Sequence, residues 1–209
     1  MKLYHMSESL HLGDTLTPDY QKCRELAEPF VQAIEKSEDC FYGMVLNGKY
    51  LFAVMDKSNL RMWADYAKWA TEGVFEFIRR REYPHQCGRM ESNYFFAEPA
   101  ECKTHFDADW GEESEEVQRS IHLFEVEVED DAPARRDMRI YDAAYDAMKA
   151  SQDTKFVMDC ARRYFAGEQT ESPMWEIMSK AKATAIRDVT EILHPFGLEK
   201  ENDSNHQSL

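Results

Sequence analysis

A long helical pattern that gives way to short alternating stretches is the feature that most limits what this chain can fold into. Between Asn59 and Arg81 apolar residues recur at the spacing of one helix face, and Pro84 ends the pattern. These apolar residues are Trp63, Tyr66, Ala67, Ala70, Val74, Phe77 and Ile78. From Ser120 to Glu129, by contrast, the residues alternate with the period of two that is typical of strands. We therefore expect a mixed α+β core.

The rest of the sequence divides into shorter predicted elements. Helical spacing of apolar residues predicts further helices over residues 18–37, 101–110, 139–149 and 154–165. Short apolar stretches predict further strands over residues 3–6, 91–97, 174–178 and 184–192. Phe41–Val45 and Lys49–Met55 are predicted to pair as a hairpin around Asn47 and Gly48. Gly73 predicts a weak point or a kink in the long helix.

The length and the ends of the chain indicate its organisation. A chain of 209 residues is long enough for one well-buried core, so we expect a single domain over residues 1–197. The segment 198–209 is almost entirely polar, and we expect it to be a disordered tail. No apolar run approaches the roughly 20 residues of a membrane span, and the N-terminus lacks the apolar stretch of a signal peptide. A cytoplasmic protein is therefore expected.

The charge of the chain limits its partners. A formal net charge of -15 argues against broad binding to nucleic acid, because such binding depends on Lys and Arg neutralising phosphates. The basic residues are nevertheless clustered, at residues 79–81 with 89, at residues 135–139 and at residues 162–163. Each cluster is either a solvated surface or part of a basic groove on an acidic body, and the sequence leaves both interpretations open.

The common catalytic signatures are missing from the sequence. It contains no P-loop, no GxGxxG, no HExxH and no GxSxG. The histidines and cysteines do not form ligand pairs at the spacing of zinc sites, so no metal is expected. Any chemistry must therefore come from residues scattered along the chain.

Three short segments, in this order, resemble those of the ADP-ribosyltransferase superfamily. They are Leu3–Met6 with the turn Leu12–Asp14, Gly88–Ala97 running into Glu101–Trp110, and Tyr164–Gly167 before Pro173–Met178. The resemblance is to the bacterial branch that includes toxins modifying nucleic acids. It implies two small sheets packed as a split β-sandwich, with helices around them and a pocket for NAD in the cleft.

The same resemblance implies roles for six residues. Glu176, Tyr94 and His5 would be catalytic, and His5, Tyr4, Arg89, Ser92 and Tyr94 would bind NAD. Cleavage of the bond between nicotinamide and ribose produces an oxocarbenium-like centre, which a carboxylate such as Glu176 stabilises. His5 would contact the adenosine ribose, Tyr94 would stack on nicotinamide, and Arg89 with Ser92 would hold the pyrophosphate. For each residue a structural role remains open, including a strand glutamate that faces water.

The residue two positions before Glu176 bears on the acceptor. Arginine-specific members of the superfamily carry an acidic residue there, whereas this chain has Met174. The resemblance thus favours a nucleic acid as acceptor, with RNA preferred, and a phage-defence toxin held by an antitoxin protein. Three alternatives stay open: modification of a protein, plain hydrolysis of NAD, and a non-catalytic binding module of the same fold.

Overall fold

The computed structural model describes residues 1–18, 20–55, 60–130, 132–151 and 153–194. Its helices are α1 (Gln21–Lys36), α2 (Glu38–Lys49), α3 (Leu60–Glu82), α4 (Pro99–Trp110), α5 (Glu115–Ser120), α6 (Met138–Lys149) and α7 (Thr154–Ala166). Its strands are β1 (Lys2–Ser7), β2 (Thr15–Leu16), β3 (Asn93–Phe95), β4 (His122–Val128), β5 (Ala134–Asp137), β6 (Trp175–Ser179) and β7 (Ala183–Asp188). The expected α+β class is confirmed.

The strands form two small antiparallel sheets. One sheet has the order β1-β4-β7-β2 and the other the order β3-β6-β5. Tyr4 and Phe96 connect them, because each backbone N–H donates to the other residue's carbonyl at 2.9 Å. Leu3, Phe95, Phe124 and Ile177 belong to the apolar cluster between the two sheets, which includes residues of both.

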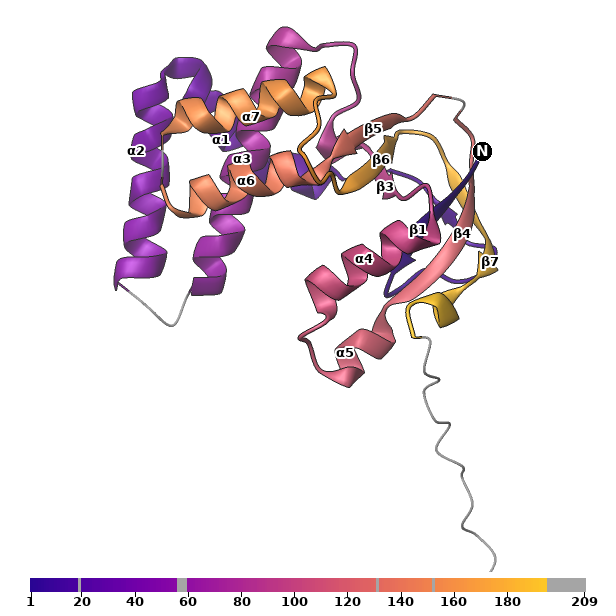
Figure 1. Cartoon of the computed structure of the whole chain (residues 1–209). Helices are drawn as coiled ribbons and strands as arrows, with labels where there is room; N and C mark the ends of the chain where they lie inside the picture. The colour runs from indigo at the N-terminus through magenta and orange to yellow at the C-terminus, as the bar shows by residue number, and fades with distance from the viewer. Residues whose placement is uncertain (19, 56–59, 131, 152, 195–209) are drawn as a thin grey trace, which may run out of the picture.

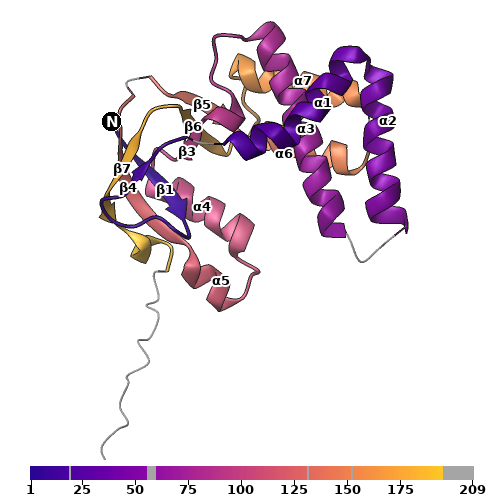
Figure 2. The same cartoon turned by 180° about the vertical axis from the view of Figure 1, so that it is seen from behind.

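Helices cover the sheets on two sides (Figures 1 and 2). The bundle of α1, α2, α3, α6 and α7 encloses the largest apolar cluster, which Met178 of β6 joins from the three-stranded sheet. Helix α4 packs through Cys102 and Phe106 against Leu123 of β4. The three-stranded sheet therefore lies between the other sheet and the bundle. Among the described residues, no helix has the length and the apolar character needed to cross a membrane.

The hairpin expected between Phe41 and Met55 is wrong. The segment instead forms α2, followed by a π-helix over Tyr50–Met55. Ser37 caps α2 by accepting a hydrogen bond from the backbone N–H of Cys40 at 3.0 Å, which favours a helical start. Gly48 makes room for an aromatic ring rather than a turn, since a Cβ there would lie 2.2 Å from Cε1 of Tyr66.

Several strand boundaries also differ from the prediction. The stretch 91–97 shortens to β3 because Arg89–Glu91 forms a 3-10 turn, closed by a bond from the N–H of Glu91 to the carbonyl of Gly88 at 3.1 Å. Ser120 ends α5 rather than beginning β4. Strand β7 stops at Asp188, whose carboxylate accepts a hydrogen bond from the N–H of Thr190 at 3.0 Å. Strand β5 was not predicted, and the tail expected at 198–209 lies outside the described residues.

The expected kink at Gly73 is replaced by a close helix contact. Helix α3 runs unbroken from Leu60 to Glu82, and a Cβ at Gly73 would lie 2.6 Å from the Cβ of Phe30 on α1. We expect Gly73→Ala to lower the free energy of unfolding by at least about 1 kcal/mol in urea denaturation, because overpacking exceeds the gain in helix propensity.

Gly43→Ala is the matched control for this substitution. Gly43 lies in α2, and nothing lies within 4 Å of a Cβ placed there. The same exchange should therefore stabilise the protein by up to about 1 kcal/mol. If both variants shifted stability in the same direction, the close contact between α1 and α3 would not be the reason for Gly73.

Candidate active site

One pocket of about 430 Å³ lies where the sheets, α4 and the helical bundle meet. Its lining residues are His5, Met6, Lys68, Arg89, Tyr94, Phe96, His105, Asp109, Trp110, Met138 and Glu176. They come from β1, the 3-10 turn Arg89–Glu91, β3 and the residue after it, β6, α3, α4 and the first residue of α6. The volume is in the range that small-molecule sites occupy. The pocket is therefore assembled from segments that are far apart in the sequence.

Glu176 is the buried carboxylate of this pocket. It is only 2% exposed, so the interpretation of a strand glutamate facing water is wrong. Its Oε1 lies 2.6 Å from Nη1 of Arg89 and accepts a hydrogen bond from the hydroxyl of Tyr164 at 2.5 Å. Ile177, its neighbour on β6, points into the cluster between the sheets. The alternation of β6 thus directs Glu176 away from the sheet core.

Arg89 holds the carboxylates in place. Its Nε lies 3.1 Å from Oε1 of Glu72 on α3, while its Nη1 contacts both Glu176 and the hydroxyl oxygen of Tyr164. The guanidinium carbon lies 3.8 Å from the ring centroid of Tyr141, a cation–π contact. Burial raises the pKa of the Tyr164 hydroxyl well above its ordinary value; Arg89 opposes this shift, and the carboxylate of Glu176 adds to it. Two carboxylates against one guanidinium leave a formal net charge of one negative unit.

His5 and Tyr94 are joined through the backbone. Nδ1 of His5 lies 2.8 Å from the carbonyl oxygen of Tyr94, so Nδ1 carries the hydrogen and Nε2 is an acceptor in the neutral ring. Burial lowers the pKa of His5, and the bond to Tyr94 opposes this only in part. The hydroxyl of Tyr94 donates to the carbonyl of Arg89 at 2.6 Å. The ring of Tyr94 is thus fixed at the wall of the pocket.

The lowered pKa of His5 predicts a pH dependence of stability. The unfolded chain binds the proton first as pH falls below about 6.5, so the stabilising contribution of neutral His5 is present above that pH and lost below it. We expect the difference in unfolding free energy between wild type and His5→Gln to shrink between pH 7.5 and pH 5.5. Urea denaturation of both proteins at the two pH values measures it. Both proteins contain His105, so its titration cancels in the comparison. If the difference in unfolding free energy grew as the pH fell, the lowered pKa of His5 would be contradicted.

Asp137 orders the segment that leads into β6. Its fully buried carboxylate accepts hydrogen bonds from the N–H groups of Arg139, Thr170 and Met174, and from the hydroxyl of Thr170, at 2.7 to 3.0 Å. Burial opposes the charge, but these bonds outweigh it and lower the pKa of Asp137. Asp137 therefore joins the start of α6 to the residues just before Glu176.

The structure brings four of the six residues singled out in the sequence to one pocket. His5, Arg89, Tyr94 and Glu176 line it, whereas Tyr4 and Ser92 do not. Tyr4 packs against the apolar cluster beneath α4. Ser92 is completely buried and its hydroxyl donates to the carbonyl of Gly88 at 2.9 Å.

Sequence reasoning missed much of the surroundings of these four residues. Lys68, His105, Asp109, Trp110 and Met138 line the pocket too, and no motif marks them. A weak signal exists for His105 and Asp109, whose spacing of four places them on one face of α4.

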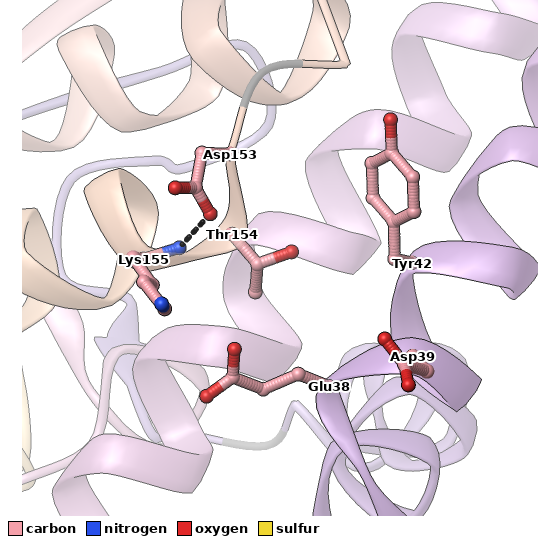
Figure 3. Close-up of a pocket in the computed structure, with 6 residues that line it drawn as sticks. All are labelled: Glu38, Asp39, Tyr42, Asp153, Thr154 and Lys155. Atoms are coloured by element: carbon pink, nitrogen blue, oxygen red, sulfur yellow. Dashed lines mark hydrogen bonds between the residues drawn. The ribbon is translucent and has the colours of Figure 1, made fainter.

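A second pocket of about 420 Å³ lies at the surface of the helical bundle, between the starts of α2 and α7 (Figure 3). Glu38, Asp39 and Tyr42 of α2 face Asp153, Thr154 and Lys155 at the start of α7. Asp153 caps α7 by accepting a hydrogen bond from the N–H of Lys155 at 3.0 Å. This pocket lacks the histidines and the buried ion pairs of the first. Within the described ranges, no three His, Cys, Asp or Glu residues gather in a way that holds a metal ion.

Comparison with known proteins gives a family but no activity. The family model described as "Protein of unknown function (DUF2441)" matches residues 3–193, a span that contains every residue of the pocket. No curated protein matches the chain.

Proposed function

Since the chain belongs to the DUF2441 family, whose function is unknown, we propose its activity from the pocket: an ADP-ribosyltransferase that uses NAD as donor. The observation that carries this proposal is that His5, Arg89, Tyr94 and Glu176 line a single pocket. Three of them, His5, Tyr94 and Glu176, are the residues to which the resemblance gives catalytic roles.

In the proposed reaction the bond between nicotinamide and ribose C1′ breaks, and both bonding electrons leave with neutral nicotinamide. The ribose then carries an oxocarbenium-like positive charge. An acceptor oxygen or nitrogen adds to C1′ and loses a proton. Glu176 would stabilise the positive centre, and the negative excess of its cluster with Glu72 and Arg89 supports this role. The acceptor lone pair of His5 Nε2 suits a ribose hydroxyl.

The ion pair between Arg89 and Glu176 fits positioning of the carboxylate. A strand side chain with several rotamers would sample orientations away from the ribose, and contacts with Arg89 and Tyr164 restrict it. The fixed ring of Tyr94 offers a face on which nicotinamide stacks. These residues thus supply orientation and charge.

For the acceptor we propose a nucleic acid, preferably RNA, and for the biological setting a cytoplasmic phage-defence toxin with an antitoxin. The surface beside Glu176 supports this acceptor. Trp175 precedes Glu176 on β6, and the guanidinium carbon of Arg135 lies 4.3 Å from its ring centroid. The exposed Arg139 lines a small hollow with Trp175. Arg135 already pairs with Glu101 at 3.2 Å, whereas no carboxylate among the described residues pairs with Arg139. Arg139 therefore suits a phosphate, and Trp175 offers a ring on which a base stacks.

The experiment that tests this function measures free nicotinamide after incubating the protein with NAD. Reactions would contain total RNA, DNA, protein lysate or buffer alone, and labelled adenylate would report which polymer gains ADP-ribose. Label on RNA or DNA supports the proposal. If only protein is labelled, the acceptor is a protein and not a nucleic acid. Release of nicotinamide without any labelled polymer indicates plain hydrolysis of NAD. Absence of release in all four reactions contradicts the activity.

A further inference from the structure

The cations that line the pocket differ in how far their charge is already compensated. Arg89 is paired with Glu72 and Glu176, and is 9% exposed. Its charge is therefore more than cancelled by its two neighbours. A ligand carrying two negative charges gains little from a cation in this state. Ser92 adds nothing, because its hydroxyl already donates to Gly88 and lies outside the pocket.

Lys68 is the pocket cation without a carboxylate partner. It lies on the exposed face of α3 and reaches the pocket, where its Nζ lies 5.4 Å from the ring centroid of Trp69. No carboxylate in the described part of the chain lies within ion-pairing distance of it. An ammonium group of this kind has three donors free for an anion.

His105 lies in the pocket wall on α4 and, like Arg89, already has a carboxylate partner. It is 6% exposed, and its Nδ1 lies 3.0 Å from Oδ2 of Asp109. Its Nε2 lies against the sulfur of Met138. Burial disfavours protonation, but Asp109 and then Glu176 outweigh burial and raise the pKa of His105. Both ring nitrogens of His105 thus have partners, and Asp109 compensates any charge on the ring, whereas Lys68 keeps its hydrogen-bond donors.

We propose that Lys68 forms a subsite for a diphosphate group. The subsite deepens the proposed function, because NAD joins a cationic nicotinamide ring to a diphosphate. The carboxylate excess at Glu176 suits the cationic ring, and the uncompensated ammonium of Lys68 suits the phosphates. This assigns the phosphates to the helical bundle rather than to the strands, and gives α3 a direct part in binding.

Calorimetric titration of the full chain with ADP-ribose, pyrophosphate and adenosine tests the subsite. Lys68→Met should weaken ADP-ribose and pyrophosphate binding about tenfold and leave adenosine binding unchanged, as expected for loss of one charged hydrogen bond. Lys68→Arg should restore most of the affinity, since it keeps a cationic donor. Lys182→Met, an exposed lysine between β6 and β7, is the matched control and should bind like wild type.

The results separate the subsite from the activity. Lys68-dependent binding of pyrophosphate and ADP-ribose supports the subsite even if no nicotinamide is ever released from NAD. Equal affinities of wild type and Lys68→Met overturn it, even if the protein cleaves NAD. A loss of adenosine binding in Lys68→Met also overturns it, because the lysine would then act on the shape of the pocket rather than on phosphate.

Discussion

Replacing Glu176 with Gln is expected to lower the rate of nicotinamide release from NAD by about 10³-fold. Gln has nearly the same shape and still accepts a hydrogen bond from Tyr164, but it carries no charge to stabilise the oxocarbenium centre. The effect should therefore fall on kcat, while the KM for NAD changes little. Steady-state kinetics with purified protein measure both, and thermal unfolding shows whether the variant is folded.

Glu72→Gln is the matched control for this prediction. Glu72 pairs with the same guanidinium and is buried to a similar degree, at 5% exposure against 2% for Glu176, but it does not line the pocket. Both variants remove one buried carboxylate from Arg89, so their stabilities should fall by similar amounts. Glu176→Gln should lose far more turnover than Glu72→Gln, which removes the negative excess of the cluster but leaves the carboxylate that lines the pocket. Equal losses of turnover in the two variants would reduce Glu176 to a structural partner of Arg89.

The pattern of residues predicted the elements that bury one regular face. Helix α3 and strand β4 were anticipated because their apolar residues keep one period over a long stretch. The segment from Phe41 to Val45 was misassigned because five residues fit both periods equally well. Tertiary packing decides between helix and strand in this segment. Phe41 and Val45 are one helical turn apart, and both are buried in the bundle.

The sequence predicts some residues of the site but not the contacts that Arg89 makes with distant segments. His5, Tyr94 and Glu176 stand in segments whose order along the chain carries a resemblance, so they were found together. The partners of Arg89 lie 17, 75 and 87 residues away, at Glu72, Tyr164 and Glu176. A buried glutamate on α3 has no local signature, since the same residue on a solvated face gives the same pattern. Only the packing of α3, α7 and β6 around Arg89 distinguishes the two.

Replacing Arg89 with Met should reduce the free energy of unfolding by about 3 to 5 kcal/mol. Met approximates the volume of the arginine stem but leaves Glu72 and Glu176 buried with their charges uncompensated. It also removes the cation that faces the ring of Tyr141. Urea denaturation at pH 7 measures the loss, and turnover of NAD should fall with it because Glu176 is no longer held.

Two further variants show whether uncompensated charge is the cause. Arg79→Met removes an equally buried arginine from α3, but its partner Glu76 keeps a second contact, to Nε of Arg80 at 2.7 Å, so the loss should be smaller. The triple variant Arg89→Met, Glu72→Gln, Glu176→Gln removes all three charges together and should recover a large part of the stability lost in Arg89→Met. If the triple variant were the least stable, packing of the guanidinium against the rings of Tyr141 and Tyr164, rather than charge balance, would hold these segments together. The carboxylate at Glu176 would then owe its orientation to packing by Tyr164 and its neighbours.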